Sequence, residues 1–313
     1  MELGFALPHL GPIATRDNIR QVAVEAERLG YHSLWTNERL LKPVNPKTPY
    51  PGNPEGVLDW QYETVFEHLT SLTYASALTE RIRLGVSLIN LPFHNPVQLA
   101  KRIATMDHLS NGRIDIGLGL GWSEDEADVT GTPFANRGRR GGEYIQAMKA
   151  LWGPDPVEFH GEFVDVPLTE FGPKPVQDPH PPLYMGAFAP VALRRAGQLA
   201  DGFTACCAPV DAILAMREAV QSAATDAGRD GSALPTVVRC LVHRTDEPLP
   251  DDGRPVAHGT WDQIHEDCVR LDEAGVEVTF FDVNFVHDAD DTEALLGYLE
   301  RFRGILDAAP AAV

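Results

Sequence analysis

Short apolar runs alternate with segments of helical periodicity along most of the chain, and this alternation restricts the fold more than any other feature. Eight such pairs occur in 313 residues. We therefore predict a single-domain (β/α)8 TIM barrel over residues 1–313, with insertion loops; an open, doubly wound sheet is the alternative. The expected strands are residues 3–7, 32–36, 82–88, 113–118, 183–185, 203–206, 236–242 and 276–283. The expected helices are residues 19–29, 62–78, 96–109, 136–152, 190–200, 212–227, 261–274 and 292–306.

Three segments interrupt the alternation. Residues 37–59 contain five prolines, which neither a helix nor a sheet accommodates. Long loops in compact domains are often functional, so we expect an ordered loop or a mobile lid here, with a plain surface excursion as the alternative. Residues 157–166 predict a hairpin that turns at His160 and Gly161, and residues 246–258 form an acidic loop.

The charge balance limits the classes of partner. The formal net charge is −19, from 45 acidic and 26 basic residues. A surface this acidic argues against nucleic acid and anionic membranes as partners, and no apolar stretch approaches the ~20 residues of a membrane helix. No C-x-x-C pair occurs among Cys206, Cys207, Cys240 and Cys268, so a zinc ribbon or redox dithiol is disfavoured. Adjacent cysteines rarely bridge each other, and we expect reduced thiols and a cytoplasmic protein. The histidines lack metal-ligand spacing, so we assign no metal.

The strand–helix–strand unit of residues 81–126 ends in alternating glycines, Gly117, Gly119 and Gly121. Glycine allows a ligand to approach the backbone closely. The spacing is not G-x-G-x-x-G, and no immediate, clear helix pattern follows, so a dinucleotide site is disfavoured. A tight barrel corner explains these glycines equally well.

Two further segments are candidates for binding an anion. Arg137, Arg139 and Arg140 gather at a predicted helix start, where cations oppose the helix dipole. Either an anionic ligand tail or nearby carboxylates (Glu124, Glu126, Asp128) would compensate them. At residues 186–189 a strand ends before a helix, and free backbone N–H groups there could hold a phosphate, although an ordinary strand–helix turn is also possible.

Together these residues resemble the luciferase-like monooxygenase family, over nearly the full length. The resemblance is carried by AERLGYHSLW (26–35), MDHLSNGRIDIGLGLGW (106–122), the F-x-G-x-F hairpin (159–163), PPLYMGA (181–187) and LADGF (199–203). The motif at 106–122 is most similar to the branch that uses the deazaflavin coenzyme F420, while FMN-dependent relatives share much of the pattern.

The resemblance implies a cofactor across the barrel mouth, with its ring at the end of the third strand and its phosphate at residues 186–189. It also implies a non-proline cis peptide between Val86 and Leu88. The cofactor-binding residues implied in this way are Ser87, Leu88, Asn90, Leu120, Gly121, Trp122, Asp125, Arg137, Arg140, Gly186, Ala187, Phe188 and Ala189.

The sequence departs from the family pattern at three places. Many members end the second strand in a histidine that acts as acid or base, whereas this chain has Glu38 and Arg39 there. Some deazaflavin sugar dehydrogenases have a catalytic glutamate at the position of Trp122, so a sugar-phosphate substrate is disfavoured. The phosphate turn, commonly Gly-Gly-x-Ser, is Gly-Ala-Phe-Ala in residues 186–189.

Glu38 and Trp122 are the candidate catalytic residues. Glu38 would be a proton donor or an electrostatic partner, unless it only forms a salt bridge to Arg39 or another arginine. Trp122 and Trp35 would line the pocket, and Trp60 would cap it; each is otherwise a core aromatic.

We expect hydride transfer between F420 and a small-molecule substrate. The alternatives are an FMN-dependent monooxygenase with a separate reductase, a non-catalytic flavin-binding protein, and a hydrolase that uses Glu38 and Glu124. The resemblance also implies a homodimer, formed through helices 62–78 and 96–109.

Overall fold

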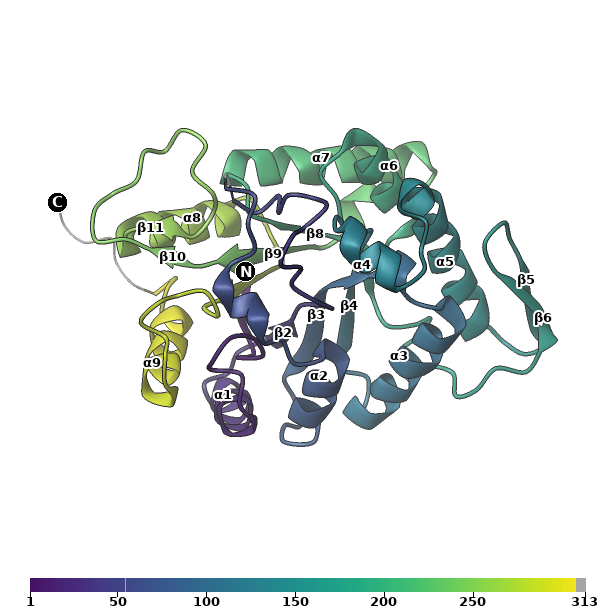
Figure 1. Cartoon of the computed structure of the whole chain (residues 1–313), viewed down its shortest axis with the longest axis horizontal. Coiled ribbons are helices and arrows are strands. Elements are labelled where there is room, and N and C mark those ends of the chain that lie inside the picture. The colour runs from purple at the N-terminus through teal and green to yellow at the C-terminus, as the bar shows by residue number, and fades with distance from the viewer. Residues whose placement is uncertain (54, 308–313) are drawn as a thin grey trace.

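A closed barrel of eight parallel strands forms the centre of the molecule (Figure 1). The computed structural model describes residues 1–53 and 55–307. Around the barrel the strand order is β1-β12-β9-β8-β7-β4-β3-β2, which confirms the predicted (β/α)8 fold and excludes the open sheet. The strands are β1 (Glu2–Ala6), β2 (Ser33–Thr36), β3 (Arg83–Asn90), β4 (Ile114–Gly119), β7 (Leu183–Gly186), β8 (Gly202–Cys206), β9 (Thr236–Leu241) and β12 (Val278–Asp282).

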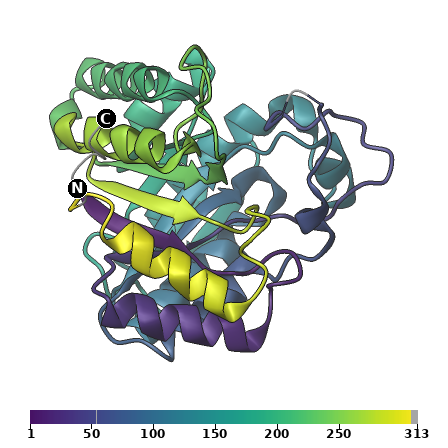
Figure 2. The same ribbon diagram turned by 90° about the vertical axis from the view of Figure 1, so that its left-hand side faces the viewer.

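The longer helices form the outer layer. The first and last of them pack side by side where the ring closes (Figure 2). Several begin at the polar caps that their sequences provide; for example, Asn95 Oδ1 accepts from the N–H groups of Val97 and Gln98 at 3.0 and 3.1 Å. The helices are α1 (Arg16–Arg28), α2 (His68–Ser76), α3 (Pro96–Ser110), α5 (Arg137–Trp152), α6 (Pro190–Leu199), α7 (Val210–Asp226), α8 (Trp261–Glu273) and α9 (Thr292–Arg303).

The remaining elements are short. The hairpin expected at 157–166 is present as β5 (Val157–His160) and β6 (Asp165–Thr169), and the acidic loop lies between the paired strands β10 (His243–Arg244) and β11 (His258–Gly259). Single 3-10 turns occur at η1 (Trp60–Glu63), η2 (Leu91–Phe93), η3 (Phe134–Asn136) and η4 (Gly231–Ala233). None of the helices that the structure describes is both long and apolar enough to span a bilayer.

Two helix predictions were wrong. The helix expected over residues 62–78 begins only at His68, because Glu67 caps it by accepting from Thr70 N at 2.6 Å. The segment after the glycine run does form a helix, α4 (Glu124–Val129). Ser123 caps it by accepting from Glu126 N at 3.3 Å, and three acidic residues occupy its first turn, where the helix dipole favours them.

Trp35 belongs to the barrel interior and does not line a pocket. Its side chain is 1% exposed and stacks on Phe280, with ring centroids 4.7 Å apart. Gly4 and Gly85 make room for it, because a Cβ at either glycine would collide with the indole. The aromatic side chain therefore fills the barrel as a packed core.

The family motif at residues 106–113 stabilises the end of the barrel opposite the C-terminal ends of the strands. Asp107 Oδ2 accepts from the N–H groups of Val176 and Gln177 at 2.6 and 2.8 Å. The Arg113 guanidinium is buried, and it donates to four backbone carbonyls and the Thr79 hydroxyl at 2.7–3.0 Å. This first half of the family motif is thus structural.

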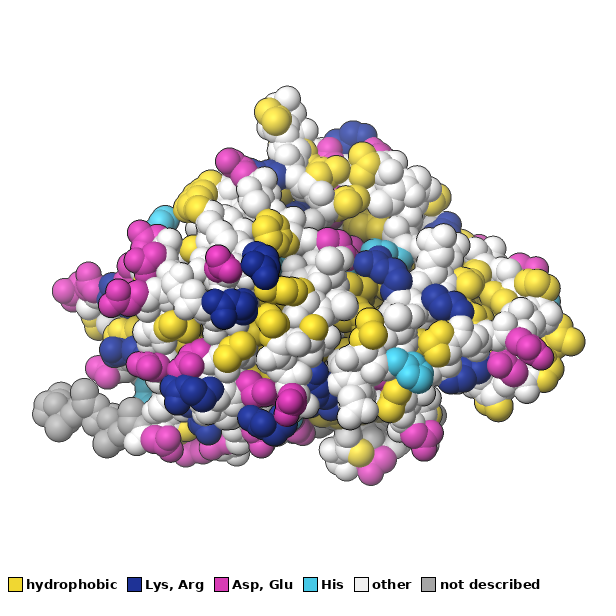
Figure 3. Space-filling model, turned by 90° about the horizontal axis from the view of Figure 1, so that it is seen from below, with side chains coloured by type: hydrophobic (Ala, Val, Ile, Leu, Met, Phe, Trp, Pro, Cys, Tyr) yellow, Lys and Arg dark blue, Asp and Glu magenta, His cyan; other side chains and the backbone are white. Residues whose placement is uncertain are grey.

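Acidic and basic side chains are interspersed on the face shown in Figure 3, and neither sign covers it. The negative net charge of the chain is therefore not gathered on this face.

Candidate functional site

The end of β3 lies at the barrel mouth and contains an irregular backbone. The Ser87–Leu88 peptide is cis, as the resemblance implied, and the register against β4 shifts between Val86 and Ile89. Ser87 is buried, whereas Leu88 and Asn90 are partly exposed. The three residues therefore lie together at the strand end where the cofactor ring was expected.

The alternating glycines make room for protein side chains. A Cβ at Gly117, Gly119 or Gly186 would lie 3.1, 2.9 or 2.6 Å from the side chain of Leu88. Gly121 has φ +73° and would collide with the Phe93 ring if it carried a side chain. The glycines of β4 and β7 thus surround Leu88, and the space attributed to a ligand at Gly117 and Gly119 is occupied by that residue.

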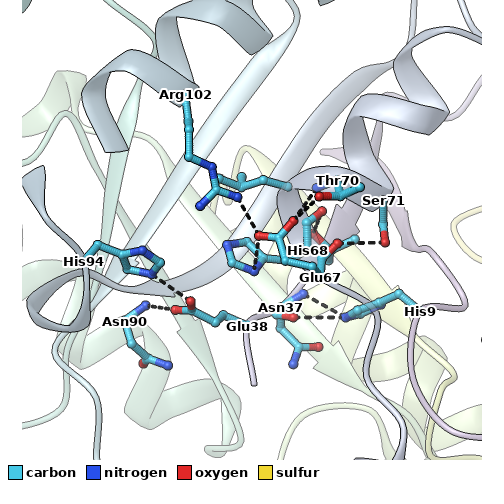
Figure 4. Close-up of polar contacts among 12 residues, drawn as sticks. His9, Asn37, Glu38, Glu67, His68, Thr70, Ser71, Asn90, His94 and Arg102 are labelled. Carbon is cyan, nitrogen blue, oxygen red and sulfur yellow. Dashed lines mark hydrogen bonds and ion pairs between the residues drawn. The ribbon is translucent and has the colours of Figure 1, made fainter. Parts of the chain in front are cut away.

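Glu38 is held between β3 and the loop before α3 (Figure 4). Its Oε2 accepts from Asn90 N at 2.5 Å, and its Oε1 accepts from His94 Nε2 at 2.7 Å. A salt bridge to Arg39 was the alternative, but Arg39 pairs with Glu126 instead. Sequence reasoning found no histidine for this site because it considered only the end of β2, whereas His94 is 56 residues away in the chain.

A second histidine adds to the electrostatics of this group. The His68 ring lies edge-on to His94 with centroids 6.5 Å apart, and none of the described residues forms a hydrogen bond with its buried Nε2. Burial acts to raise the pKa of the Glu38 carboxyl, but the His94 hydrogen bond and the charges of His94 and His68 outweigh it, so the pKa lies below its usual value. Burial lowers the pKa of His68 against the opposing charges of Glu38 and Glu67.

The proline-rich loop (residues 37–59) is fixed to α4 through its backbone. Glu126 Oε1 accepts from the N–H groups of Leu40 and Leu41 at 2.8 and 3.4 Å. Asp125 Oδ2 accepts from Lys47 N at 2.9 Å. These contacts join residues 40–47 of the loop to α4, and they place the Asp125 carboxylate against the loop backbone.

Trp122 lies beneath the same loop. The Arg39 guanidinium stacks over its ring at 4.8 Å, and the Tyr50 ring lies 5.3 Å away. Trp60, expected to cap the site, is 48% exposed, and Tyr50 and Tyr62 lie over the mouth in its place. The hydrolase alternative has no support here, because Glu124 is exposed on α4 while Glu38 is held by His94.

The arginines near the start of α5 have different partners. Arg139 forms an ion pair with Glu162 at 2.7 Å. Arg137 donates to the carbonyls of Gly121 and Phe134, and Arg140 donates to the hydroxyl of Tyr144 and, at 3.4 Å, to Asn136 Oδ1. Within the described ranges, no carboxylate forms an ion pair with Arg137 or Arg140, so the compensation considered from Glu124, Glu126 or Asp128 does not occur at these two arginines.

The start of α6 is a second group of unused donors. The helix begins at Pro190 without a side-chain cap, and among the residues described none accepts from the N–H of Phe188 or Ala189. Ala187 is buried, and the Phe188 side chain is 60% exposed. Arg195, from the second turn of α6, approaches Gly138 of α5, so the two helix starts are neighbours. Leu120 packs against Gly141 of α5.

A buried polar network at the mouth was not foreseen. The Arg239 guanidinium donates to Asp282 Oδ2 at 2.5 Å and to Asn37 Oδ1 at 3.2 Å. His9 Nε2 accepts from Asn37 N at 3.0 Å, while its Nδ1 donates to Leu7 O at 2.8 Å. Burial lowers the pKa of His9, so the ring is neutral. The spacing of these residues along the chain does not predict the network.

Comparisons with known proteins identify both F420-dependent and flavin-dependent relatives. A family model described as luciferase-like monooxygenase matches residues 3–249. An uncharacterized protein of Mycobacterium tuberculosis is 36% identical over 228 residues, 72% of this chain and 78% of that protein. An F420-dependent glucose-6-phosphate dehydrogenase of Amycolatopsis mediterranei is 30% identical over 187 residues, 58% of this chain and 51% of that protein. The oxygenase component of a flavin-dependent trigonelline monooxygenase of Acinetobacter baylyi is 35% identical over 178 residues, 56% and 44% of the two chains.

Solved structures share the fold. A monooxygenase from Streptomyces bottropensis superposes with a TM-score of 0.76 at 19% identity, covering 98% of each chain. An F420-dependent secondary alcohol dehydrogenase has the same TM-score at 17% identity and the same coverage. At these identities the likeness concerns the fold alone.

Proposed function

The chain belongs to the luciferase-like monooxygenase family, and on this premise we propose that it is an oxidoreductase that transfers a hydride between coenzyme F420 and a small organic substrate. Its relatives include an F420-dependent dehydrogenase and a flavin-dependent oxygenase component, which supports a deazaflavin or flavin cofactor. The observation that carries the dehydrogenase proposal is the hydrogen-bonded pair Glu38–His94 beside the end of β3.

The donor groups around α5 and α6 fit the anionic end of such a cofactor. Arg137 and Arg140 have no acidic partner among the described residues, and the uncapped start of α6 leaves N–H groups at Phe188 and Ala189 without acceptors. Backbone N–H groups at a helix start bind phosphate well. The turn needs no serine for this, so its departure from the family pattern removes only a hydroxyl contact.

The Glu38–His94 pair would hold and transfer the proton that accompanies hydride transfer. Bound F420 supplies the hydride acceptor or donor. Because the pKa of Glu38 is lowered, its carboxylate stays charged near neutral pH and does not donate a proton. Of the two roles considered for Glu38, the electrostatic one is therefore better supported. Its Oε1 accepts from Nε2 of His94 at 2.7 Å and so orients the ring, and we assign the proton exchanged with the substrate to the other ring nitrogen, Nδ1.

Cofactor titration is the first test. The purified chain is titrated separately with F420 and FMN, and fluorescence quenching measures each dissociation constant. We expect tight F420 binding that weakens in Arg140→Gln, while Arg139→Gln, whose charge pairs with Glu162, serves as the matched control. Tight FMN binding with no F420 binding would instead support the second candidate, an FMN-dependent monooxygenase with a reductase, which the relative from Acinetobacter baylyi favours.

Turnover is tested next with a panel of small alcohols, aldehydes and ketones, followed by F420 absorbance. We expect Glu38→Gln and His94→Gln each to lower kcat about 100-fold or more, since positioned proton transfer contributes about 10²–10⁴, with little change in F420 affinity. His108→Gln is the control, because His108 lies near the other end of α3 and contacts Lys174 O. If wild type binds F420 tightly yet reduces or oxidises nothing in the panel, the non-catalytic binding protein is the better description.

A further inference from the structure

The two adjacent cysteines lie at the barrel mouth, apart from the groups assigned above. Cys206 is the last residue of β8, and Cys207 follows it with φ +54°, so the chain turns there. Both residues are partly exposed, whereas Cys240 and Cys268 are fully buried. C-terminal strand ends form the functional face of a TM barrel, so the accessible thiols belong to that face.

The surroundings of the pair are polar, because the ion pair of Arg239 and Asp282 lies beside it. Cys206 is paired across the sheet with Arg239 of β9, whose guanidinium donates to Asp282, and the two neighbouring thiols shift each other's pKa. The Cys207 thiol also lies near Tyr50 of the proline-rich loop. Thiolates beside arginine in a partly exposed setting are the reactive ones. The contact with Cys207 is the main cause that lowers the pKa of Cys206 to about 7, with a further contribution from Arg239, while the pKa of Cys207 is raised.

We propose that Cys206 and Cys207 form a dithiol site at the barrel mouth that captures soft, thiol-seeking centres, with trivalent organoarsenic compounds as the chemical class. Sulfur ligands select soft centres, and two partly exposed thiols on consecutive residues at a chain turn can bind one arsenic atom together. With phenylarsine oxide, two As–S bonds form, the arsenic–oxygen bond breaks, and the two thiol protons leave with the oxygen as water. Arsenic stays trivalent, so no oxidant or reductant is needed. Capture of arsenic by the two thiols does not require the proposed cofactor.

Intact-mass spectrometry of the reduced, purified chain tests the proposal. Phenylarsine oxide is titrated into wild type, Cys206→Ser, Cys207→Ser and the double variant, after circular dichroism and thermal melts confirm that each is folded. We expect one arsenical per chain in wild type, at least about tenfold weaker capture in each single variant, and none in the double variant. Equal capture by wild type and the double variant, or no capture by wild type, overturns the proposal.

Alkylation mapping gives a second readout that needs no substitution. Native protein is treated with iodoacetamide at pH 7, and peptides are quantified over time, with a fully unfolded sample as the reference for all four cysteines. A thiol of pKa about 7 is about half ionised at that pH, against a few per cent for an ordinary cysteine. We expect Cys206 to be modified about tenfold faster than an ordinary thiol, and prior phenylarsine oxide to protect it. Modification of Cys240 or Cys268 at the same rate as Cys206 would refute the proposal, because the buried thiols would then be as reactive as the accessible one.

Discussion

Replacing Glu126 by alanine should release the proline-rich loop from α4. The carboxylate is 1% exposed and forms an ion pair with Arg39 at 2.9 Å, and the Arg39 side chain is itself only 7% exposed. Its other oxygen accepts from Leu40 N at 2.8 Å and more weakly from Leu41 N. A single side chain thus anchors the start of the loop through two kinds of contact.

The magnitude follows from these contacts. Removing one partner of a buried ion pair costs about 3–5 kcal/mol, because the other charge stays buried, and a hydrogen bond to a charged acceptor contributes about 1.5–3 kcal/mol. The two contributions overlap, so we take about 4 kcal/mol for the whole anchor. If the whole loss destabilises only the closed position of the loop, the equilibrium constant for loop opening rises by about a thousandfold, since each 1.36 kcal/mol is a factor of ten.

Hydrogen exchange read by mass spectrometry measures this shift in peptides that cover residues 39–48. We expect Glu126→Ala to exchange there far faster than wild type, while peptides from β4 and β8 keep their protection. Glu126→Gln should fall between the two, because its carbonyl oxygen can still accept from Leu40 N. Glu63→Ala is the matched control: Glu63 pairs with Lys42 of the same loop but is 69% exposed, and such pairs contribute about 0–1 kcal/mol.

A double-mutant cycle separates the ion pair from the backbone contacts. Arg39→Met in the Glu126→Ala background removes the unpaired buried cation, so part of the lost protection should return. Unchanged exchange of residues 39–48 in Glu126→Ala would refute the reasoning. So would a uniform loss of protection over the whole barrel, because the carboxylate would then stabilise the fold rather than the loop.

Three further predictions concern stability. Burial, followed by the neighbouring His243 and Arg254, lowers the pKa of His258 to about 4. Below about pH 6.5 the unfolded chain therefore binds more protons than the folded one, and the free energy of unfolding falls as pH drops towards 4. In urea unfolding at pH 7 and pH 5, His258→Gln should make the fall between the two pH values about 1–3 kcal/mol smaller. Arg113→Lys should cost about 3–5 kcal/mol in the same assay, because lysine cannot reach all five acceptors; a cost below 1 kcal/mol would contradict this. Gly117→Ala should destabilise more than Gly119→Ala, because its Cβ meets the Val86 carbonyl whereas that of Gly119 meets only the movable end of Leu88; equal melting temperatures would contradict this order.

The barrel could be predicted because its signals are local and repeated. Each strand and helix carries its own periodicity and stop signals, and the closed topology confirms them. The predictions failed where one local pattern competed with another. The stretch before His68 has apolar residues at helical spacing, yet Glu67 provides the cap that starts α2, and the short acidic segment 124–129 has no apolar period although its Ser123 cap is clear.

The candidate site could be predicted only in part. Strand ends indicated the mouth, and the resemblance indicated the Ser87–Leu88 cis peptide. Partners far apart in sequence, such as Glu38 with His94, are set by how the loops fold over the barrel, and no pattern of spacing encodes this. The glycines around Leu88 show the same limit, because glycine in a sequence does not say whether a ligand or a side chain fills the space.

The contacts that anchor the proline-rich loop have a consequence for how this barrel could evolve. Apart from the side chains of Arg39, Lys47 and Thr48, the anchor points of the loop against α4 are main-chain groups: the N–H groups of Leu40, Leu41 and Lys47 meet carboxylates of α4. A carboxylate that binds a main-chain N–H does not depend on which side chain the residue carries, proline excepted. The loop can therefore change its side chains, and with them the wall it presents above Trp122, while its path over the mouth is retained. Substrate preference could drift in this way without renewed optimisation of the fold.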